Sequence, residues 1–170
     1  MKNHRLLGLL VAGLLMIPGD VGAEEADSTA DMEMLNHYEA IRLALLEDST
    51  ESVAEHGKAL QEKAKNLLVD FKAVSAAVPE EDAATHKATL LEIESAASGL
   101  STAQDLTSAR EGLFVLTEPM AKYRKLTGDQ STVVAYCPMA EKAWIQPVGE
   151  IGNPYLGQEM PKCGEVVGES

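Results

Sequence analysis

Hydrophobic residues recur every three or four positions from about residue 31 to residue 127, which is the spacing of one face of an α-helix. The first stripe predicts a helix over residues 31–47. It consists of Met34, Tyr38, Ile41 and Leu45. The second helix should begin with a capping box at Ser52 and Glu55 and end before Pro79, because proline disfavours helical conformation in the residue before it. Its stripe consists of Val53, Gly57, Leu60, Ala64, Leu67, Phe71, Val74 and Val78.

Two further helices follow Pro79. The third should begin in the acidic segment 79–82, which suits the positive end of the helix dipole, and end at Gly99. Two alternative buried faces fit it, Ala84, Ala88 and Leu91 or Leu90, Ile93 and Ala97. The fourth should begin with a capping box over residues 101–104 and end at Gly128. Its stripe consists of Leu106, Ala109, Leu113, Leu116, Met120 and Tyr123.

These four amphipathic helices with short connections predict a mainly α fold, an antiparallel four-helix bundle over residues 31–128. The pattern changes after Gly128, where proline and glycine become frequent. A β-branched segment, 132–136, should form a short strand paired with residues 143–146, followed by ordered loops. Residues 129–170 are therefore expected to form a hairpin and loop tail packed on the helices.

The N-terminal residues have the pattern of a secretory signal peptide. Lys2 and Arg5 precede an apolar run of 12 residues, 6–17, and small residues end the segment at Ala23. We expect cleavage after Ala23, a flexible N-terminus over residues 24–30, and export to the periplasm. The run is shorter than the ~20 residues that span a bilayer, so we expect no membrane span.

The charge of the chain narrows the classes of partner. The formal net charge is −13, and removing the predicted leader takes away two basic residues and one acidic residue, which leaves −14. An acidic surface and only seven aromatic residues disfavour nucleic acid and favour cationic ligands. No serine lies in a nucleophile elbow, no histidine is near a cysteine in sequence, and no phosphate loop follows a strand, so we expect no enzyme. His56 and His86 have no suitable partner at helical spacing and are interpreted as surface or helix-flank residues.

Candidate chemistry gathers in the tail. Cys137 and Cys163 are the only cysteines, and each has a methionine nearby, Met139 and Met160. In an extended segment, Cys137 and Met139 would point to the same face. Two thiolates and two thioethers would form a soft metal site that suits Cu(I) or Ag(I) rather than Mg²⁺ or Ca²⁺.

The same segment resembles a known family. The resemblance rests on Ala135-Tyr136-Cys137-Pro138-Met139-Ala140, Trp144, Ile151-Gly152-Asn153-Pro154-Tyr155-Leu156-Gly157, Met160 and Cys163-Gly164-Glu165-Val166. These runs are similar to a periplasmic helical domain family of unknown biochemical activity, which is described as heavy-metal binding and also occurs fused to adaptor subunits of copper/silver efflux pumps. The resemblance implies a helical bundle with a metal-binding tail and an efflux component as a partner.

Four residues are expected to pack around the metal ligands: Trp144, Tyr136, Asn153 and Tyr155. Two alternatives stay open for the cysteines. A Cys137–Cys163 disulfide would close a loop of about 25 residues and stabilise a helical protein-interaction module without metal by roughly 3 kcal/mol. A Zn²⁺ site could recruit a carboxylate such as Glu165.

A weaker secondary metal candidate lies in the first helix. Met34 and His37 are one helical turn apart, although Met34 also belongs to the hydrophobic stripe.

Overall fold

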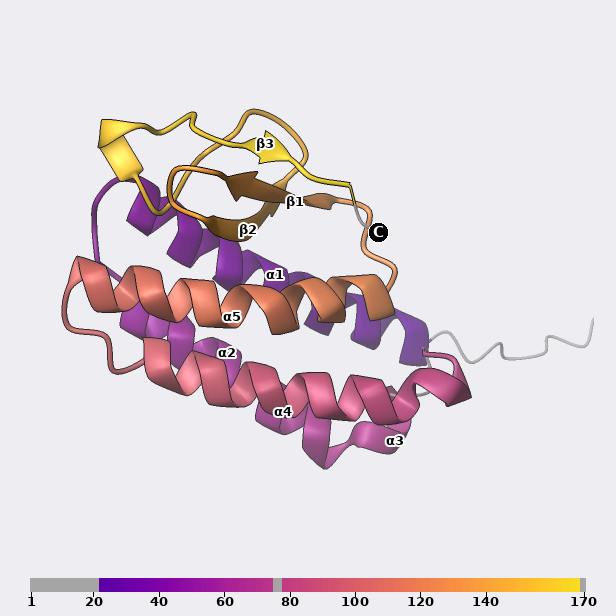
Figure 1. The fold of residues 1–170 in the computed structure, drawn as a ribbon. Coiled ribbons are helices and arrows are strands. Elements are labelled where there is room, and N and C mark those ends of the chain that lie inside the picture. The colour runs from indigo at the N-terminus through magenta and orange to yellow at the C-terminus, as the bar shows by residue number, and fades with distance from the viewer. Residues whose placement is uncertain (1–21, 75–77, 169–170) are drawn as a thin grey trace, which may run out of the picture.

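The computed structural model describes residues 22–74 and 78–168. The chain is mainly helical, with a small antiparallel sheet near its C-terminus (Figure 1). Its helices are α1 (Gly22–Leu46), α2 (Val53–Val69), α3 (Phe71–Val74), the 3₁₀ turn η2 (Glu80–Asp82), α4 (Ala83–Leu100), α5 (Leu106–Leu126) and the 3₁₀ turn η3 (Gly157–Glu159). In these described ranges, none of the helices combines the length and apolarity that crossing a bilayer requires.

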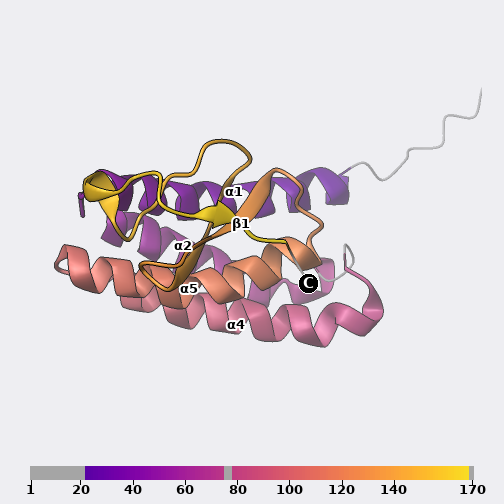
Figure 2. The ribbon, with the colours of Figure 1, turned by 45° about the horizontal axis from the view of Figure 1, so that its top comes forward.

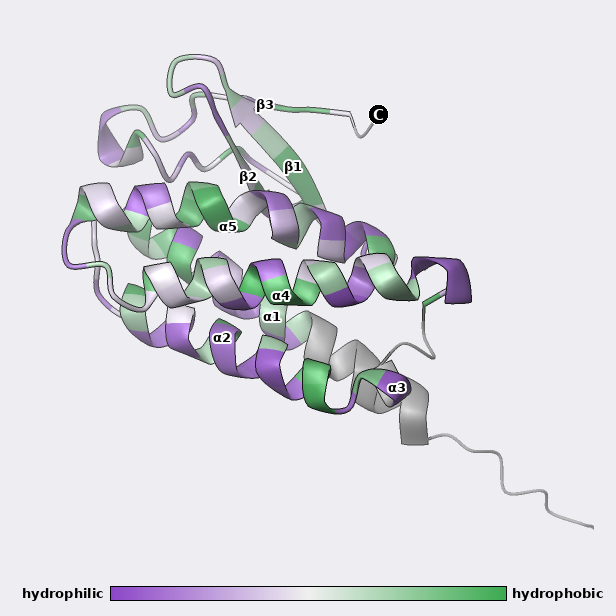
Figure 3. Cartoon of the chain, turned by 60° about the horizontal axis from the view of Figure 1, so that its bottom comes forward, coloured by the Kyte–Doolittle hydropathy of each residue, from purple (hydrophilic) through white to green (hydrophobic). Residues whose placement is uncertain are grey.

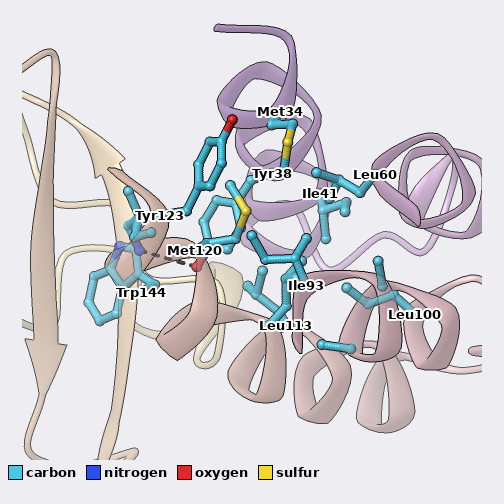
Figure 4. Close-up of a cluster of buried hydrophobic side chains, with 14 of the residues drawn as sticks. Met34, Tyr38, Ile41, Leu60, Ile93, Leu100, Leu113, Met120, Tyr123 and Trp144 are labelled. Atoms are coloured by element: carbon cyan, nitrogen blue, oxygen red, sulfur yellow. Dashed lines mark hydrogen bonds between the residues drawn. The ribbon is translucent and has the colours of Figure 1, made fainter. Parts of the chain in front are cut away.

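Most residues of the predicted hydrophobic stripes form the core, whereas Phe71 and Leu106 are half-buried at its edge. α4 packs against α2 and α5, and α1 packs against the same two helices. Along these helices hydrophobic and hydrophilic residues interchange at short intervals (Figure 3), and the hydrophobic ones meet in one cluster (Figure 4). For α4 the structure selects the second predicted face, because Leu90, Ile93 and Ala97 are buried whereas Leu91 is 49% exposed.

Several predicted helix boundaries were wrong. α1 begins at Gly22 rather than residue 31, so the expected flexible segment 24–30 is helical. Ser52 has a φ of 64° and makes no side-chain cap, so α2 lacks the predicted capping box. α2 also ends at Val69 rather than before Pro79, because Asp70 leaves the helical conformation and the short helix α3 follows. α4 continues through Gly99 to Leu100. The capping box of α5 is formed by Asp105 and Ser108, whose side chains bond each other's backbone N–H.

The leader prediction lies largely outside the described residues. Its charged and apolar regions fall within residues 1–21.

The predicted hairpin is confirmed. β1 (Thr132–Cys137) pairs antiparallel with β2 (Lys142–Pro147), with Val134 opposite Ile145. A third strand, β3 (Glu165–Val166), was not predicted and joins the free edge of β1 to give the order β2-β1-β3. The sheet and its loops lie on one side of the helices, over α1 and α5 (Figures 1 and 2).

The Tyr38 hydroxyl joins the sheet to two helices. It accepts the backbone N–H of Ile145 in β2 at 3.1 Å. It donates to Thr117 Oγ1 in α5 at 2.7 Å, because the Thr117 hydroxyl in turn donates to Leu113 O at 2.8 Å. Tyr38 is 1% exposed, and this burial raises the pKa of its phenol to about 12, so the hydroxyl keeps its proton.

We predict that Tyr38→Phe lowers the free energy of unfolding by about 1–3 kcal/mol, because it leaves the Ile145 N–H buried without its acceptor. Urea unfolding of the variant measures the loss. The matched control is Tyr136→Phe, which removes a hydroxyl with no hydrogen bond among the described residues and should change stability by less than about 0.5 kcal/mol. Equal losses in both variants would contradict the assigned role of Tyr38.

Candidate functional site

The fold brings the two cysteines together. The Sγ atoms of Cys137 and Cys163 lie 2.9 Å apart, and both residues are free thiols. The pairing of β1 with β3 causes this approach: Tyr136 lies opposite Glu165, so the last residue of β1 faces the turn that enters β3. Cys137 is buried and Cys163 is half-buried, so the thiol pair reaches solvent on the Cys163 side.

The turn of the hairpin closes over the Cys137 sulfur. Residues 138–141 connect β1 to β2, and within this turn the Ala140 N–H points to Cys137 Sγ with a nitrogen-to-sulfur distance of 3.4 Å. The backbone of Met139 also favours the ionised form of both thiols and so acts to lower the pKa of each. The Cys-Pro-Met-Ala sequence therefore surrounds one sulfur with N–H groups, which stabilise a negative charge there.

These contacts shift the pKa values of the two thiols in opposite directions. Burial opposes ionisation of Cys137, but the hydrogen bonds to its sulfur, from Cys163 first and then from Ala140 and Met139, outweigh burial and lower its pKa. The pKa of Cys163 is raised, chiefly because its thiol donates to Cys137 and also because of desolvation. Loss of the first proton therefore leaves a thiolate on Cys137 that accepts the Cys163 S–H.

Asn153 holds the loop that carries Cys163. Its side chain is fully buried, and Asn153 Oδ1 accepts the N–H groups of Tyr155 and Leu156 at 2.8 and 3.0 Å. Asn153 Nδ2 donates to Cys163 O at 2.8 Å, and the Asn153 N–H donates to Pro161 O at 2.8 Å. One side chain thus closes a turn and fixes the position of the second cysteine.

Two arginines from the helices hold the same loop. Arg42 in α1 donates to Gly152 O at 2.6 Å, and its other nitrogens form a bidentate pair with Glu39 at 2.6 and 2.7 Å. Arg110 in α5 donates to Pro154 O at 2.8 Å and to Asp48 Oδ1 at 2.5 Å. These contacts fix the loop on both sides of Asn153.

Trp144 lies against Gly164, the residue that follows the second cysteine. It is fully buried, and its indole N–H donates to Gln146 Oε1 at 2.9 Å. Its ring meets Tyr155 edge to face at 6.1 Å, and Tyr155 donates to Ala143 O at 2.7 Å. Gly164 has a φ of 136°, and a Cβ at that position would lie 2.6 Å from Trp144 Cη2. Only glycine therefore lets the turn after Cys163 lie against the indole.

The methionines are arranged differently from the cysteines. β1 ends at Cys137, so Met139 lies in the turn and not on the strand face that an extended segment would give. Met139 is 65% exposed and Met160 is 38% exposed. Met160 follows η3, and its carbonyl accepts the Cys163 N–H at 3.1 Å. The structure brings the two thiols into contact and leaves both thioethers on flanking turns at the surface.

The other predicted metal residues are separated. Met34 is fully buried in the core. His37 instead meets His56 of α2. His86 is 1% exposed, so the interpretation of His86 as a surface or helix-flank residue was wrong. Within residues 22–74 and 78–168 no group of three or more His, Cys, Asp and Glu residues is arranged to hold a metal ion. Two surface hollows of about 500 and 720 Å³ have no cysteine in their lining.

The chain matches no protein-family model, no curated protein and no solved structure.

We predict opposite shifts when either thiol of the reduced protein is removed. Cys163→Ala should raise the pKa of Cys137, because a buried sulfur loses its strongest donor, and Cys137→Ala should lower the pKa of Cys163, because the sulfur that its thiol donates to is gone. The pH dependence of alkylation by iodoacetamide measures both values. Shifts of the same sign in both variants would contradict the shared proton.

Proposed function

We propose that this protein binds a soft monovalent cation, Cu(I) or Ag(I), through the Cys137 and Cys163 thiolates. The observation that carries the proposal is the meeting of the two sulfurs beside N–H groups that favour a thiolate on Cys137. Soft thiolate and thioether ligands select Cu(I) over hard cations. The acidic surface, with a formal net charge of −13, favours the approach of cations.

Metal entry requires a small movement of one cysteine. Two sulfurs bound to one ion at about 2.3 Å lie about 3.8 Å apart or more, which is wider than the 2.9 Å contact. Cys163 is half-buried, so rotation of its side chain can move its sulfur outward while Asn153 still holds the Cys163 carbonyl and Cys137 stays fixed at the end of β1. Binding displaces the remaining thiol proton to solvent, so metal affinity should rise with pH.

The methionines are proposed as additional ligands. Met139 lies in the turn that follows Cys137. The Met160 carbonyl accepts a hydrogen bond from the Cys163 N–H. Thioethers carry no proton and can join a Cu(I) site without deprotonation. Their exposure makes them suitable for capturing an ion from solvent and passing it to the thiolates.

The cellular setting follows from the sequence. The signal-peptide pattern supports export to the periplasm, and the family resemblance supports a role in buffering, sensing or delivering copper or silver to an efflux component. We also propose that the four long helices form an antiparallel bundle that serves as the scaffold. The packing of α1 and α4 against both α2 and α5 supports this arrangement.

The close approach of the sulfurs favours a second candidate function, a disulfide-stapled interaction module without metal. Thiol–disulfide exchange with an oxidised dithiol partner would remove both thiol protons and two electrons and join Cys137 to Cys163. The same reaction would close the metal site, so oxidation would abolish Cu(I) binding. If the two cysteines were permanently oxidised, the protein could not bind Cu(I) and would act only as an interaction module.

We predict that the reduced protein binds Cu(I). Cys137→Ser or Cys163→Ser should weaken the Cu(I) affinity by more than about 100-fold, because even the loss of a residue that only supports a metal ligand costs about 10–100-fold in affinity. Met139→Leu and Met160→Leu should each weaken it by about 10-fold. Anaerobic competition with a chromophoric Cu(I) chelator measures these affinities. Zn²⁺ ligated by the cysteines and Glu165 would instead tolerate both methionine variants.

The matched control is Met32→Leu, because Met32 is 60% exposed on α1 and lines a hollow without cysteines. Its affinity should equal that of the unmodified protein. Full affinity in Cys163→Ser would overturn the site. No binding in the reduced protein, together with a lower Tm after reduction, would favour the stapled module.

A further inference from the structure

A second cluster of metal-ligating side chains lies between α1 and α2, apart from the cysteines. His37 Nδ1 and His56 Nδ1 are 3.0 Å apart, and the ring centroids are separated by 5.2 Å with the planes tilted by 44°. Both side chains are half-buried, so solvent reaches the pair. Each ring comes from a different helix, and the packing of α1 against α2 fixes their approach.

We propose that His37 and His56 form a binding site for a divalent transition-metal ion, with Cu(II) as the preferred ion. Imidazole nitrogens suit Cu(II), Ni(II) and Zn(II), and the Irving–Williams order places Cu(II) first. The proposal is independent of the thiolate site and of its function.

The spacing of the two nitrogens selects the geometry. Two nitrogens bound at about 2.0–2.1 Å in adjacent corners of a square lie about 2.9 Å apart, whereas a tetrahedral ion separates them by about 3.3 Å. The observed 3.0 Å fits adjacent positions in a tetragonal ion. The ring torsions of histidine are broad, so small rotations direct both lone pairs to one point.

The surroundings of His37 favour its neutral ring. Burial is the main cause that lowers the pKa of His37, and His56 and Lys63 lower it further, whereas Glu33 and Glu55 raise it. Metal binding requires unprotonated nitrogens, so the lowered pKa of His37 reduces the competition of protons with a metal ion at that ring. In the hydrogen bond between the rings, one Nδ1 carries a proton. When the ion binds, that ring changes tautomer: the proton leaves Nδ1 to solvent and Nε2 of the same ring takes up another, so no net proton is released.

The protein supplies two ligands, and water completes the coordination. Glu33 lies one helical turn before His37 and pairs with Lys63. An ion bound here would join α1 to α2 and stabilise the fold by mass action, because the unfolded chain does not hold the two rings together.

The test uses Cu(II) and the Cys137→Ser/Cys163→Ser protein, in which no thiol can reduce or bind the ion. One Cu(II) should bind with an electron paramagnetic resonance spectrum that shows nitrogen ligation, and the Tm should rise. His37→Gln or His56→Gln should each weaken binding by about 10-fold or more and remove the Tm shift. Lys58→Gln, whose side chain is 70% exposed on α2, is the control and should bind as before.

A second probe, Ni(II), allows the test to be made without the double cysteine variant, in case that variant folds poorly. Ni(II) is not reduced by thiols, so the Tm shift that it causes is measured in the unmodified chain and in His56→Gln. The proposal requires a larger shift in the unmodified chain. Equal Cu(II) affinity in both histidine variants and their parent, or equal Ni(II) shifts, would show a hydrogen-bonded pair only and overturn the site.

Discussion

The Tyr38 hydroxyl is the constraint on which the placement of the sheet depends. It occupies both of its hydrogen-bonding directions, one toward Ile145 in β2 and one toward Thr117 in α5. A buried N–H of a strand is costly to leave without an acceptor, and here a helix supplies that acceptor. The ring of Tyr38 also belongs to the hydrophobic core, so one side chain couples the packing of the helices to the register of the sheet (Figure 4).

The proposed metal chemistry follows from this placement. With β2 fixed, β1 and the hairpin turn are positioned, and the turn surrounds Cys137 with N–H donors. The long loop after β2 returns to β1 because Arg42, Arg110 and Asn153 bond its carbonyl groups. The second cysteine therefore reaches the first through a chain of polar contacts that begins on the helices. Loosening these contacts should increase the separation of the sulfurs without unfolding the helices.

The sequence pattern predicted the helices better than the site. Helical periodicity identified most of the buried stripes, and β-branched residues identified the hairpin, because both signals are local. It left two faces open for α4 and extended the second helix past Val69, where α2 ends. The strand β3 has two residues and carries no such signal. Met139 was wrongly placed on the strand face. β1 ends at Cys137 because a turn begins there, and strand propensity alone does not show where that turn begins. The meeting of His37 and His56 was missed because each histidine was considered within its own helix, whereas the pair forms between helices.

The central claim is that the two thiols form an open soft-metal site when reduced. The most direct test is the native mass of the protein as isolated from cells, and again after anaerobic reduction and addition of one equivalent of Cu(I). We expect the reduced protein to retain one copper ion through desalting. A protein lighter by about 2 Da, as a disulfide requires, that stays free of metal even after reduction would contradict it.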